Sequence, residues 1–361
     1  MKEFRRLVKS SVATLLHQLS VDNLIGHSTG GARGPIVICY HRVVQNFEDA
    51  ATRAMPSLLI STSMFEKQLD WLAAHFDMVS LDEILQGPQH SGKRRQATIT
   101  FDDGYADFYW NALPILQKKK IPSAVFVVTD LVGTTNLQIH DELYLLLSHW
   151  FKSPEANKEL TPGEAPTDPL SATLDATLAL HSDPFAAARY FLEVFSRREV
   201  VAMLALLQRR VKVSTQSLQE FESLNWPLLR IMHEQGVTIG SHTCSHSLLP
   251  HHDQQRVEAE LRGSREHLET ELGMPTKYLA FPDGQFDERI TLAAEAAGYQ
   301  AALTICNHLS QERPRYTVPR TVLWENACID NTGRFSPAIM GCLVNGVFNL
   351  SSRCAQDHHA S

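Results

Sequence analysis

The stretch Ala97-Thr98-Ile99-Thr100-Phe101-Asp102-Asp103-Gly104 contains the pattern that decides the fold. Its first five residues form one of several short strand-forming runs in the chain, most of which are continuous apolar runs rather than alternating ones. Such a run is typical of a parallel strand that is buried on both faces. Two carboxylates and a glycine follow at once. The stretch therefore predicts a buried parallel strand with acidic side chains at its carboxyl end.

Similar runs recur along the chain, with amphipathic helical patterns between them. This alternation of strand and helix is typical of an α/β protein with a parallel sheet. The pattern by itself allows either a (β/α) barrel or a doubly wound sheet. The other expected strands are 36–40, 124–128, 237–240, 278–281, 301–305 and 316–318.

Residues 130–225 interrupt the alternation. They contain no convincing strand, and their apolar residues recur at helical spacing on both sides of a polar, proline-rich piece. Because the segment is too long for a loop, we expect a helical insertion within one α/β domain that spans 34–350. Such an insertion would serve as a cap over the site or as a partner surface. We expect 351–361 to be a flexible tail.

The composition narrows the classes of protein. Of 361 residues, 43% are hydrophobic, and 33 Lys and Arg against 40 Asp and Glu give a net charge of −7. These values are typical of a globular protein, and the acidic balance argues against nucleic acid as a partner. The six cysteines form no C-x-x-C pair, so neither a disulfide framework nor a cysteine zinc site is expected. No apolar run is long enough to predict a spanning helix.

Residues 1–33 are expected to form an amphipathic helix followed by a linker. Apolar residues recur at helical spacing within 1–20, with Arg5, Arg6 and Lys9 beside them. A helix docked on the domain is the simpler interpretation, and attachment to an anionic membrane surface is the alternative. Because the segment lacks the unbroken apolar core and cleavage site of a signal peptide, we expect a cytoplasmic protein, either free or peripheral to the inner membrane.

Polar side chains follow several of the expected strands. In parallel α/β folds the carboxyl ends of the strands meet on one face, where the chemistry collects. Two adjacent carboxylates on that face would repel each other unless a cation or a proton shared the site. Imidazoles beside them can complete an oxygen and nitrogen site for a divalent metal. The residues at these strand ends include His41, Asp102, Asp103, His242, His246, Asp283 and Arg320.

Two stretches together carry a resemblance to a known family. Thr100-Phe101-Asp102-Asp103-Gly104-Tyr105 and Ser241-His242-Thr243-Cys244-Ser245-His246 resemble the first two motifs of the polysaccharide deacetylases, which are metal-dependent carbohydrate esterases. Phe281-Pro282-Asp283-Gly284 resembles a variant of the third motif. The resemblance implies a distorted (β/α) barrel of about seven parallel strands. It covers residues 36–46, 61–132 and 237–322.

The resemblance also assigns roles to residues. It implies that Asp103, His242 and His246 bind one divalent metal, with zinc as the expected ion. Asp102 would be the general base that takes a proton from water. The backbone N–H of Tyr105 would help to hold the oxyanion that forms during the reaction.

The general acid is expected to be a histidine. The family's late Leu-x-x-His motif has no clean copy here, and Ile305-Cys306-Asn307-His308 is the nearest match. Some members are permuted and take the acid from an N-terminal Tyr-His motif, which Tyr40-His41 resembles. We therefore expect His41 to be the acid and keep His308 as the alternative.

An arginine in the third motif usually orients the base, but Lys277 and Tyr278 occupy that region in this chain. Arg320 on the last expected strand could supply the charge, with Asp283 nearby. The alternative for either residue is that it belongs only to a rim ion pair of little energetic value.

The function that this resemblance implies is metal-dependent hydrolysis of an N-acetyl group from an amino sugar, in a glycan or a glycan precursor. A hydrolase of another small-molecule amide or C–N bond is the first alternative. It would be favoured if the insertion closed the cleft around a small substrate. A non-catalytic glycan-binding protein is the second. It would be expected if the base or a ligand were missing, and all four residues are present.

Overall fold

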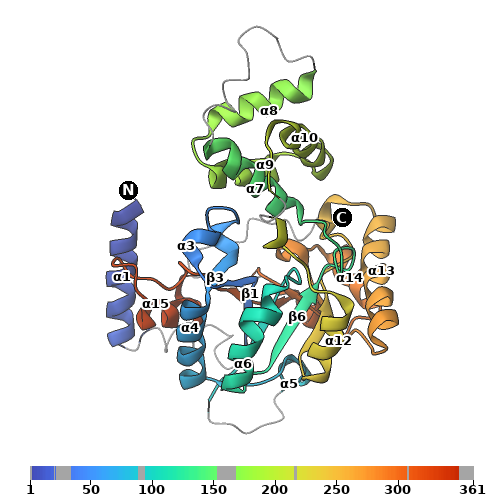
Figure 1. Cartoon of the computed structure of the whole chain (residues 1–361). Coiled ribbons are helices and arrows are strands. Elements are labelled where there is room, and N and C mark those ends of the chain that lie inside the picture. Colours follow the sequence, from blue (N-terminus) through green and yellow to red (C-terminus); the bar gives the residue numbers. More distant parts are fainter. Residues whose placement is uncertain are drawn as a thin grey trace. The chain divides into compact units, whose positions relative to one another are not determined.

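The computed structural model describes residues 2–19, 21, 34–87, 94–152, 168–214, 218–306 and 309–348. The chain forms two compact units, whose elements are labelled in Figure 1. The first unit comprises Met1–Gln45, Ile60–Thr134 and Ser223–Ser361, and the second comprises Asn46–Leu59 and Thr135–Glu222. The expected flexible tail, 351–361, lies outside the described residues.

The first unit contains a parallel sheet whose strands run in the order β10-β9-β8-β7-β6-β5-β1-β11, while the short β4 pairs with the start of β5. Each pair of neighbours in this order is parallel, which confirms the expected parallel α/β architecture. The strands are β1 (Ile36–Tyr40), β4 (Asp77–Met78), β5 (Gln96–Phe101), β6 (Ser123–Val127), β7 (Thr238–Ser241), β8 (Tyr278–Ala280), β9 (Ala301–Thr304), β10 (Val318–Pro319) and β11 (Thr321–Val322). A separate two-stranded sheet pairs β2 (Arg42–Val44) with β3 (Leu59–Ser61).

The barrel is closed by one short segment. Strands β10 and β11 are separated by a single residue, Arg320, yet they pair with β9 and β1 at opposite edges of the sheet. The Arg320 N–H donates to Thr304 O at 2.9 Å, and Leu323 N donates to Cys39 O at 2.9 Å. The chain therefore crosses from one edge to the other at Arg320 and joins them.

The last strand begins later than the sequence predicts. Residues 316–318 were expected to be a strand, but Pro314–Tyr316 forms a 3-10 turn and the strand begins at Val318. Proline starts the turn, where its missing N–H costs nothing. The Tyr316 hydroxyl donates to Tyr299 O at 2.7 Å, which holds the turn against the barrel.

The strands are apolar on both faces because both faces are covered. On β1, Ile36, Ile38 and Tyr40 belong to the cluster shared with the outer helices, whereas Val37 belongs to the cluster with Phe126 inside the barrel. This double burial is why the runs in the sequence do not alternate with polar residues. It also places every second side chain of a strand inside the barrel.

Helices surround the strands of this unit, as Figure 1 shows for α4, α6, α12 and α13. A π-helical turn, Phe108–Ala112, leads into α6. Helix α13 begins at the Asp253 cap, whose side chain accepts from Arg256 N, and ends at Gly273 in the left-handed conformation, as its stop signal predicts. The helices are α1 (Lys2–Gln18), α4 (Thr62–His75), α5 (Leu81–Gln86), α6 (Leu113–Lys119), α12 (Trp226–Glu234), α13 (Gln254–Leu272), α14 (Glu288–Ala296) and α15 (Pro337–Val344).

Helix α1 lies against α15, as the docked-helix interpretation predicts. Ala13 is fully buried in a cluster with Ile339 and Cys342 of α15. Another face of the α1 segment is apolar but exposed, at Val12, Leu15 and Leu19. None of the helices in the described part of the chain is long and apolar enough to cross a membrane.

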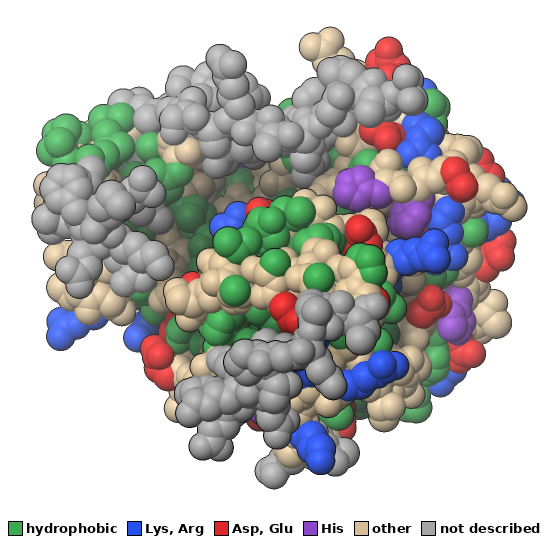
Figure 2. All heavy atoms as spheres, turned by 90° about the horizontal axis from the view of Figure 1, so that it is seen from above, with side chains coloured by type: hydrophobic (Ala, Val, Ile, Leu, Met, Phe, Trp, Pro, Cys, Tyr) green, Lys and Arg blue, Asp and Glu red, His purple; other side chains and the backbone are tan. Residues whose placement is uncertain are grey.

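The second unit is helical, as expected for the insertion. Its core is formed by leucines and aromatic residues of α7 to α10. The unit also includes 46–59 with α3 (Phe47–Ala50), which lies outside the range 130–225 expected from the sequence. Figure 2 draws the whole chain, and on the face that it shows the basic and acidic side chains are interspersed. The other helices are α7 (Ile139–Lys152), α8 (Pro169–Leu180), α9 (Pro184–Val194) and α10 (Arg197–Arg210).

Candidate active site

The carboxyl ends of the barrel strands bring the expected polar residues together. Asp102 and Asp103 follow β5, His242 follows β7, His41 follows β1, and Arg320 lies at the closure between β10 and β11. These residues come from strands that neighbour one another or face one another across the barrel interior. A single cluster forms because all the strands point the same way.

Three of the side chains form a group that could hold a metal ion. Asp103 Oδ1 lies 3.6 Å from His242 Nε2 and 3.3 Å from His246 Nε2. One ligand atom from each residue lies within 4.8 Å of the other two. The Asp103 and His242 side chains are buried, and His246 is partly accessible at 13%. Two of the three possible ligands are thus enclosed by the protein, and the third, His246, is partly accessible to solvent.

The orientation of His242 fits metal binding. Its Nδ1 lies 2.8 Å from Ala280 O at the end of β8, so this nitrogen carries the proton and Nε2 is left to face Asp103. Backbone acceptors of this kind orient many metal-binding histidines. Burial lowers the pKa of His242 and outweighs the opposing effect of Asp102. The neutral imidazole that results is the form that binds a cation, so the donor set suits a divalent ion with nitrogen and oxygen ligands.

The loops that carry these residues have unusual backbone conformations. Five non-glycine residues in the described part of the chain have positive φ, and four of them lie in the loops after β5, β7 and β8. Conformations of this kind are costly and are found most often at functional sites. Gly104 also has φ of +73°, and a Cβ there would lie 2.8 Å from Val127 Cγ1, so only glycine fits after the two aspartates. The four residues are Asp103, Thr243, His246 and Asp283.

Asp102 is held by Arg320 inside the barrel. Nη1 and Nη2 of Arg320 donate to Oδ1 and Oδ2 of Asp102, both at 2.6 Å. The exposed fractions of the two side chains are 0% and 4%, so water screens the pair little. Burial acts to raise the pKa of Asp102, but the charge of Arg320 and its hydrogen bonds to the carboxylate outweigh burial, and the pKa is lowered. Asp102 is therefore an oriented, ionised carboxylate.

The other neighbours of Asp102 are His242, His41 and Cys39. Asp102 Oδ2 lies 4.0 Å from His242 Nε2 and accepts from Cys39 Sγ at 3.5 Å. A ring nitrogen of His41 lies within 4.8 Å of both Cys39 Sγ and an Asp102 oxygen. Burial raises the pKa of the Cys39 thiol, which stays protonated as a donor. This contact could not be predicted from the sequence, in which Cys39 is one small residue of an apolar strand.

Asp107 is a second residue that the sequence analysis missed. Its carboxylate accepts from Arg42 Nε at 2.9 Å and from Val43 N at 3.2 Å. The Arg42 guanidinium also lies over the Tyr105 ring, 4.9 Å from its centroid. Asp107 and Arg42 thus link the segment that follows His41 to the segment that begins at Tyr105. Their separation of 65 residues hides the pair from any local pattern.

Some of the expected neighbours are not brought together. Asp283 is exposed, and within the described residues the ion pair of Arg320 is with Asp102 rather than with Asp283. His308, the alternative acid, lies outside the described residues. Lys277 pairs instead with Asp82 at 3.1 Å, at the start of β8 and so at the opposite end of the barrel from Asp102.

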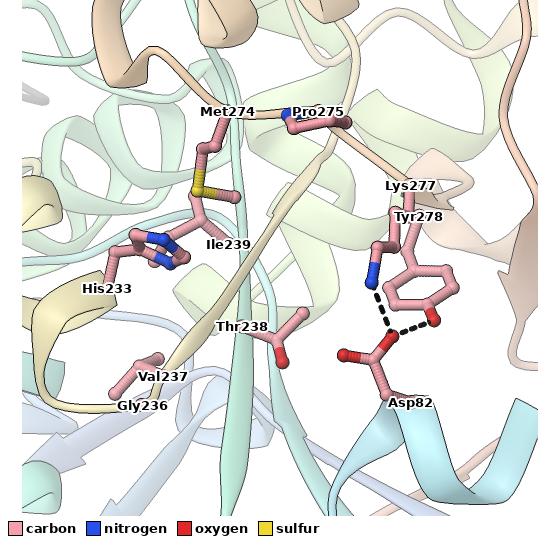
Figure 3. A pocket seen from close by; sticks show the side chains of 10 residues that line it. All are labelled: Asp82, His233, Gly236, Val237, Thr238, Ile239, Met274, Pro275, Lys277 and Tyr278. Atoms are coloured by element: carbon pink, nitrogen blue, oxygen red, sulfur yellow. Dashed lines mark hydrogen bonds and ion pairs between the residues drawn. The ribbon is translucent and has the colours of Figure 1, made fainter.

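That opposite end contains a cavity of about 390 Å³ (Figure 3). Lys277 and the Tyr278 hydroxyl both point to the Asp82 carboxylate, which anchors α5 to the start of β8. Amino-terminal ends of barrel strands are associated with stability rather than with chemistry. The cavity is lined by Asp82, His233, Gly236, Val237, Thr238, Ile239, Met274, Pro275, Lys277 and Tyr278.

A comparison with protein families decides the relationship. The model of the family described as polysaccharide deacetylase matches residues 89–156 and 171–302, which is more than half of the chain. The chain belongs to the polysaccharide deacetylase family. The matched residues include Asp102 and all three residues of the ligand group, Asp103, His242 and His246. The resemblance seen in the motifs is therefore confirmed.

Curated relatives within this family carry a specific name. Poly-beta-1,6-N-acetyl-D-glucosamine N-deacetylase of Staphylococcus aureus (strain MRSA252) is 31% identical over 156 residues, which cover 37% of this chain and 53% of that protein. The protein of the same name from Staphylococcus epidermidis is 30% identical over 111 residues, or 28% of this chain and 38% of that protein. The chain thus spans about half the length, or less, of these relatives.

Solved structures show the same fold. The Streptococcus pyogenes deacetylase PplD, in complex with acetate, is 16% identical and covers 83% of this chain and 95% of that chain, with a TM-score of 0.51. IcaB from Ammonifex degensii is also 16% identical and covers 87% and 97% of the two chains, with a TM-score of 0.51. At this level of identity the likeness concerns the distorted (β/α) barrel.

Proposed function

We propose that this protein is a metal-dependent hydrolase that removes an N-acetyl group from an amino sugar in a glycan or a glycan precursor. The observation that carries the proposal is that a possible metal ligand and a possible general base are adjacent residues at the carboxyl end of β5. Asp103, with His242 and His246, forms a ligand group, and the adjacent Asp102 is kept ionised and fixed by Arg320. A base beside a partly accessible ligand group is the arrangement that metal-assisted hydrolysis needs.

Asp103, His242 and His246 would hold the ion, and we propose zinc, because two imidazoles and one carboxylate are a common catalytic zinc set. A divalent ion bound there polarises the amide carbonyl and lowers the pKa of water. For binding of the ion, the protein has to keep the two imidazoles neutral. The hydrogen bond from His242 Nδ1 to Ala280 O and the burial of the ring both favour that form.

Asp102 is the proposed general base. It accepts a proton from the water molecule that attacks the amide carbon. Arg320 occupies one lone pair on each oxygen and the Cys39 thiol occupies a second one on Oδ2, so a second lone pair on Oδ1 remains for the water proton. The backbone N–H of Tyr105, three residues along the same loop, is proposed to donate to the carbonyl oxygen as negative charge develops on it.

His41 is the proposed general acid. It would donate a proton to the amine nitrogen as the C–N bond breaks, which leaves acetate and a free amino sugar. The support is that a ring nitrogen of His41 lies within 4.8 Å of an Asp102 oxygen, from the neighbouring strand. An acid that precedes the Asp102 loop in sequence agrees with the permuted branch of the family, to which we propose that the chain belongs.

The substrate class is proposed from the names of the relatives. Proteins that share 30–31% of residues over the matched region are called poly-beta-1,6-N-acetyl-D-glucosamine N-deacetylases. A β-1,6-linked oligomer of N-acetylglucosamine is therefore the first substrate to test. Monomeric N-acetylglucosamine and simple acetamides test the alternative of a small-molecule amide hydrolase.

The experiment is acetate release from this panel, with the protein first stripped of metal and then reloaded with Zn²⁺. We expect release from the oligomer that is lost after stripping and restored by reloading. Asp102→Asn should lower kcat by about 10²–10⁴-fold, the usual contribution of a general base. Acetate release that persists without metal, or that is unchanged in Asp102→Asn, would disprove the mechanism.

We also propose peripheral contact of residues 1–20 with the cytoplasmic face of a membrane. The support is the exposed apolar face of the α1 segment at Val12, Leu15 and Leu19, which follows the basic residues Arg5 and Lys9 in sequence. Cytoplasmic leaflets carry the anionic lipids that attract such basic segments. An enzyme placed there would meet a lipid-linked or nascent glycan.

A further inference from the structure

The loop that carries His246 depends on a buried carboxylate from another element. Glu260 of α13 is 1% exposed, although it lies on a helix whose buried face is otherwise formed by small or apolar side chains. It accepts from Ser245 N at 2.9 Å and from Ser245 Oγ at 2.6 Å. It also accepts from Ser247 Oγ at 3.3 Å. The two serines are the residues on either side of His246.

Charge compensation for Glu260 comes from its own helix. Arg256, one turn earlier, donates to Glu260 Oε1 at 2.6 Å, and about half of the Arg256 side chain is exposed. The charge of the buried Glu260 carboxylate is therefore balanced by Arg256 at the surface. The other hydrogen bonds that the carboxylate accepts come from the loop that carries His246. A buried carboxylate requires hydrogen bonds to compensate for lost water, and here those bonds go to the residues that flank His246.

The loop needs a brace because its backbone is strained. Thr243 and His246 have φ of +67° and +55°, in the left-handed region that side chains with a Cβ disfavour. A strained conformation persists only where its surroundings over-determine it. The Thr243 hydroxyl accepts from His246 N at 3.1 Å within the loop, and the contacts with Glu260 tie the residues on both sides of His246 to helix α13.

We propose that Glu260 is a positioning residue that presets His246 as the third ligand of the site. The inference rests on the proposed function, because it assigns to His246 the role of a metal ligand. A second residue of the same helix face supports the other end of the motif. Ser264, four residues on, contacts Ser241 Oγ at 2.8 Å, and Ser241 Oγ in turn accepts from Thr243 N at 3.1 Å. Helix α13 thus braces the motif at both ends.

The test is the affinity of the metal-free protein for Zn²⁺, measured by competition with a chromophoric chelator. Glu260→Ala should bind Zn²⁺ about 10- to 100-fold more weakly, as is usual when a partner that orients a ligand is lost. Glu260→Gln should lose less, because its amide oxygen can still accept from Ser245 N. The matched control is Glu258→Gln, which removes the same charge from an exposed position on the same helix and should bind like wild type.

Two further readouts separate positioning from general stability. The visible spectrum of bound Co²⁺ should change in Glu260→Ala, because His246 no longer occupies a fixed position. At saturating Zn²⁺, kcat should return to within about threefold of wild type, as Zn²⁺ itself then draws His246 into place. If Glu260→Ala does not fold, Ser245→Ala keeps the carboxylate and removes one bond to the loop, and should still weaken binding several-fold.

The outcomes distinguish this inference from the proposed function. If wild type binds Zn²⁺ and Glu260→Ala binds it within about twofold, the positioning role is wrong and the proposed function stands. If Glu260→Ala is weakened no more than Glu258→Gln, the conclusion is the same. If wild type itself binds neither Zn²⁺ nor Co²⁺, the proposed function and this inference both fail.

Discussion

Replacing Arg320 by methionine removes the guanidinium that holds Asp102 and leaves a carboxylate buried at 3% exposure without its main counter-charge. Breaking one side of a buried pair typically costs about 3–5 kcal/mol of unfolding free energy, because the remaining charge is uncompensated. Asp102→Asn should also lower the unfolding free energy, because it leaves the buried Arg320 guanidinium without its counter-charge. The double variant, Arg320→Met with Asp102→Asn, leaves neither charge and should recover much of the loss.

The magnitude follows from the geometry. Two unit charges about 4 Å apart attract by about 4 kcal/mol at an effective dielectric constant of 20. Both Arg320–Asp102 contacts measure 2.6 Å and both side chains are almost fully buried. We therefore apply this attraction energy to the pair, and not the smaller energy of an ion pair at the surface. We therefore expect a coupling energy of about 3–4 kcal/mol from the double-mutant cycle.

The assay is urea unfolding of the metal-free proteins, since a bound ion would add its own stabilisation. The control is the same cycle on Arg230 and Glu271, a pair at 2.8 Å whose side chains are 46% and 35% exposed. That cycle should give no more than about 1 kcal/mol. A coupling energy for Arg320 and Asp102 as small as that of the control would refute the argument that the barrel interior makes this pair strong.

Three shorter predictions follow. The pKa of Asp102 is lowered in the folded protein, so its ionised form stabilises the fold. This contribution is complete above the pKa of Asp102 in the unfolded chain, about 3.9, and is lost as the pH falls below that value. Urea midpoints measured from pH 6 downward should therefore fall more steeply near pH 4 in wild type than in Asp102→Asn, and equal slopes would contradict the lowered pKa. His41→Gln should lower kcat by about 10²–10⁴-fold with Zn²⁺ affinity unchanged, as measured by acetate release and chelator competition, and near-normal kcat would return the acid role to His308. Leu15→Glu should reduce co-sedimentation with anionic vesicles, and wild-type protein that does not sediment with them would end the membrane proposal.

Local sequence was sufficient where a residue's role depends on its immediate neighbours. The run 97–101 predicts a doubly buried strand because both faces of β5 are covered, and the boundary at Asp102 follows where the apolar residues end. The seventh strand was predicted less well, because a two-residue strand beside a 3-10 turn has too few residues to show a period.

The partners of the site residues were a different matter. From the sequence Arg320 could orient the base or could belong only to a rim ion pair, and its pairing with Asp102 required the closure of the barrel. Glu260 carries a faint signal as a charged residue in an otherwise apolar helical row. That signal becomes interpretable only when the loop around His246 is placed against the helix.

What the sequence determined by itself was therefore most of the barrel strands, the order of the motifs and the residues that could bind a metal, because each is written in a few consecutive positions. What only the tertiary structure decided was pairing. Arg320 meets Asp102 across 218 residues because the chain crosses from β10 to β11 at that point and seals the barrel. A buried charge needs a partner, which can come from any part of the chain that the fold places beside it. Which residue becomes the partner therefore depends on the closed shape of the sheet and not on a local sequence pattern.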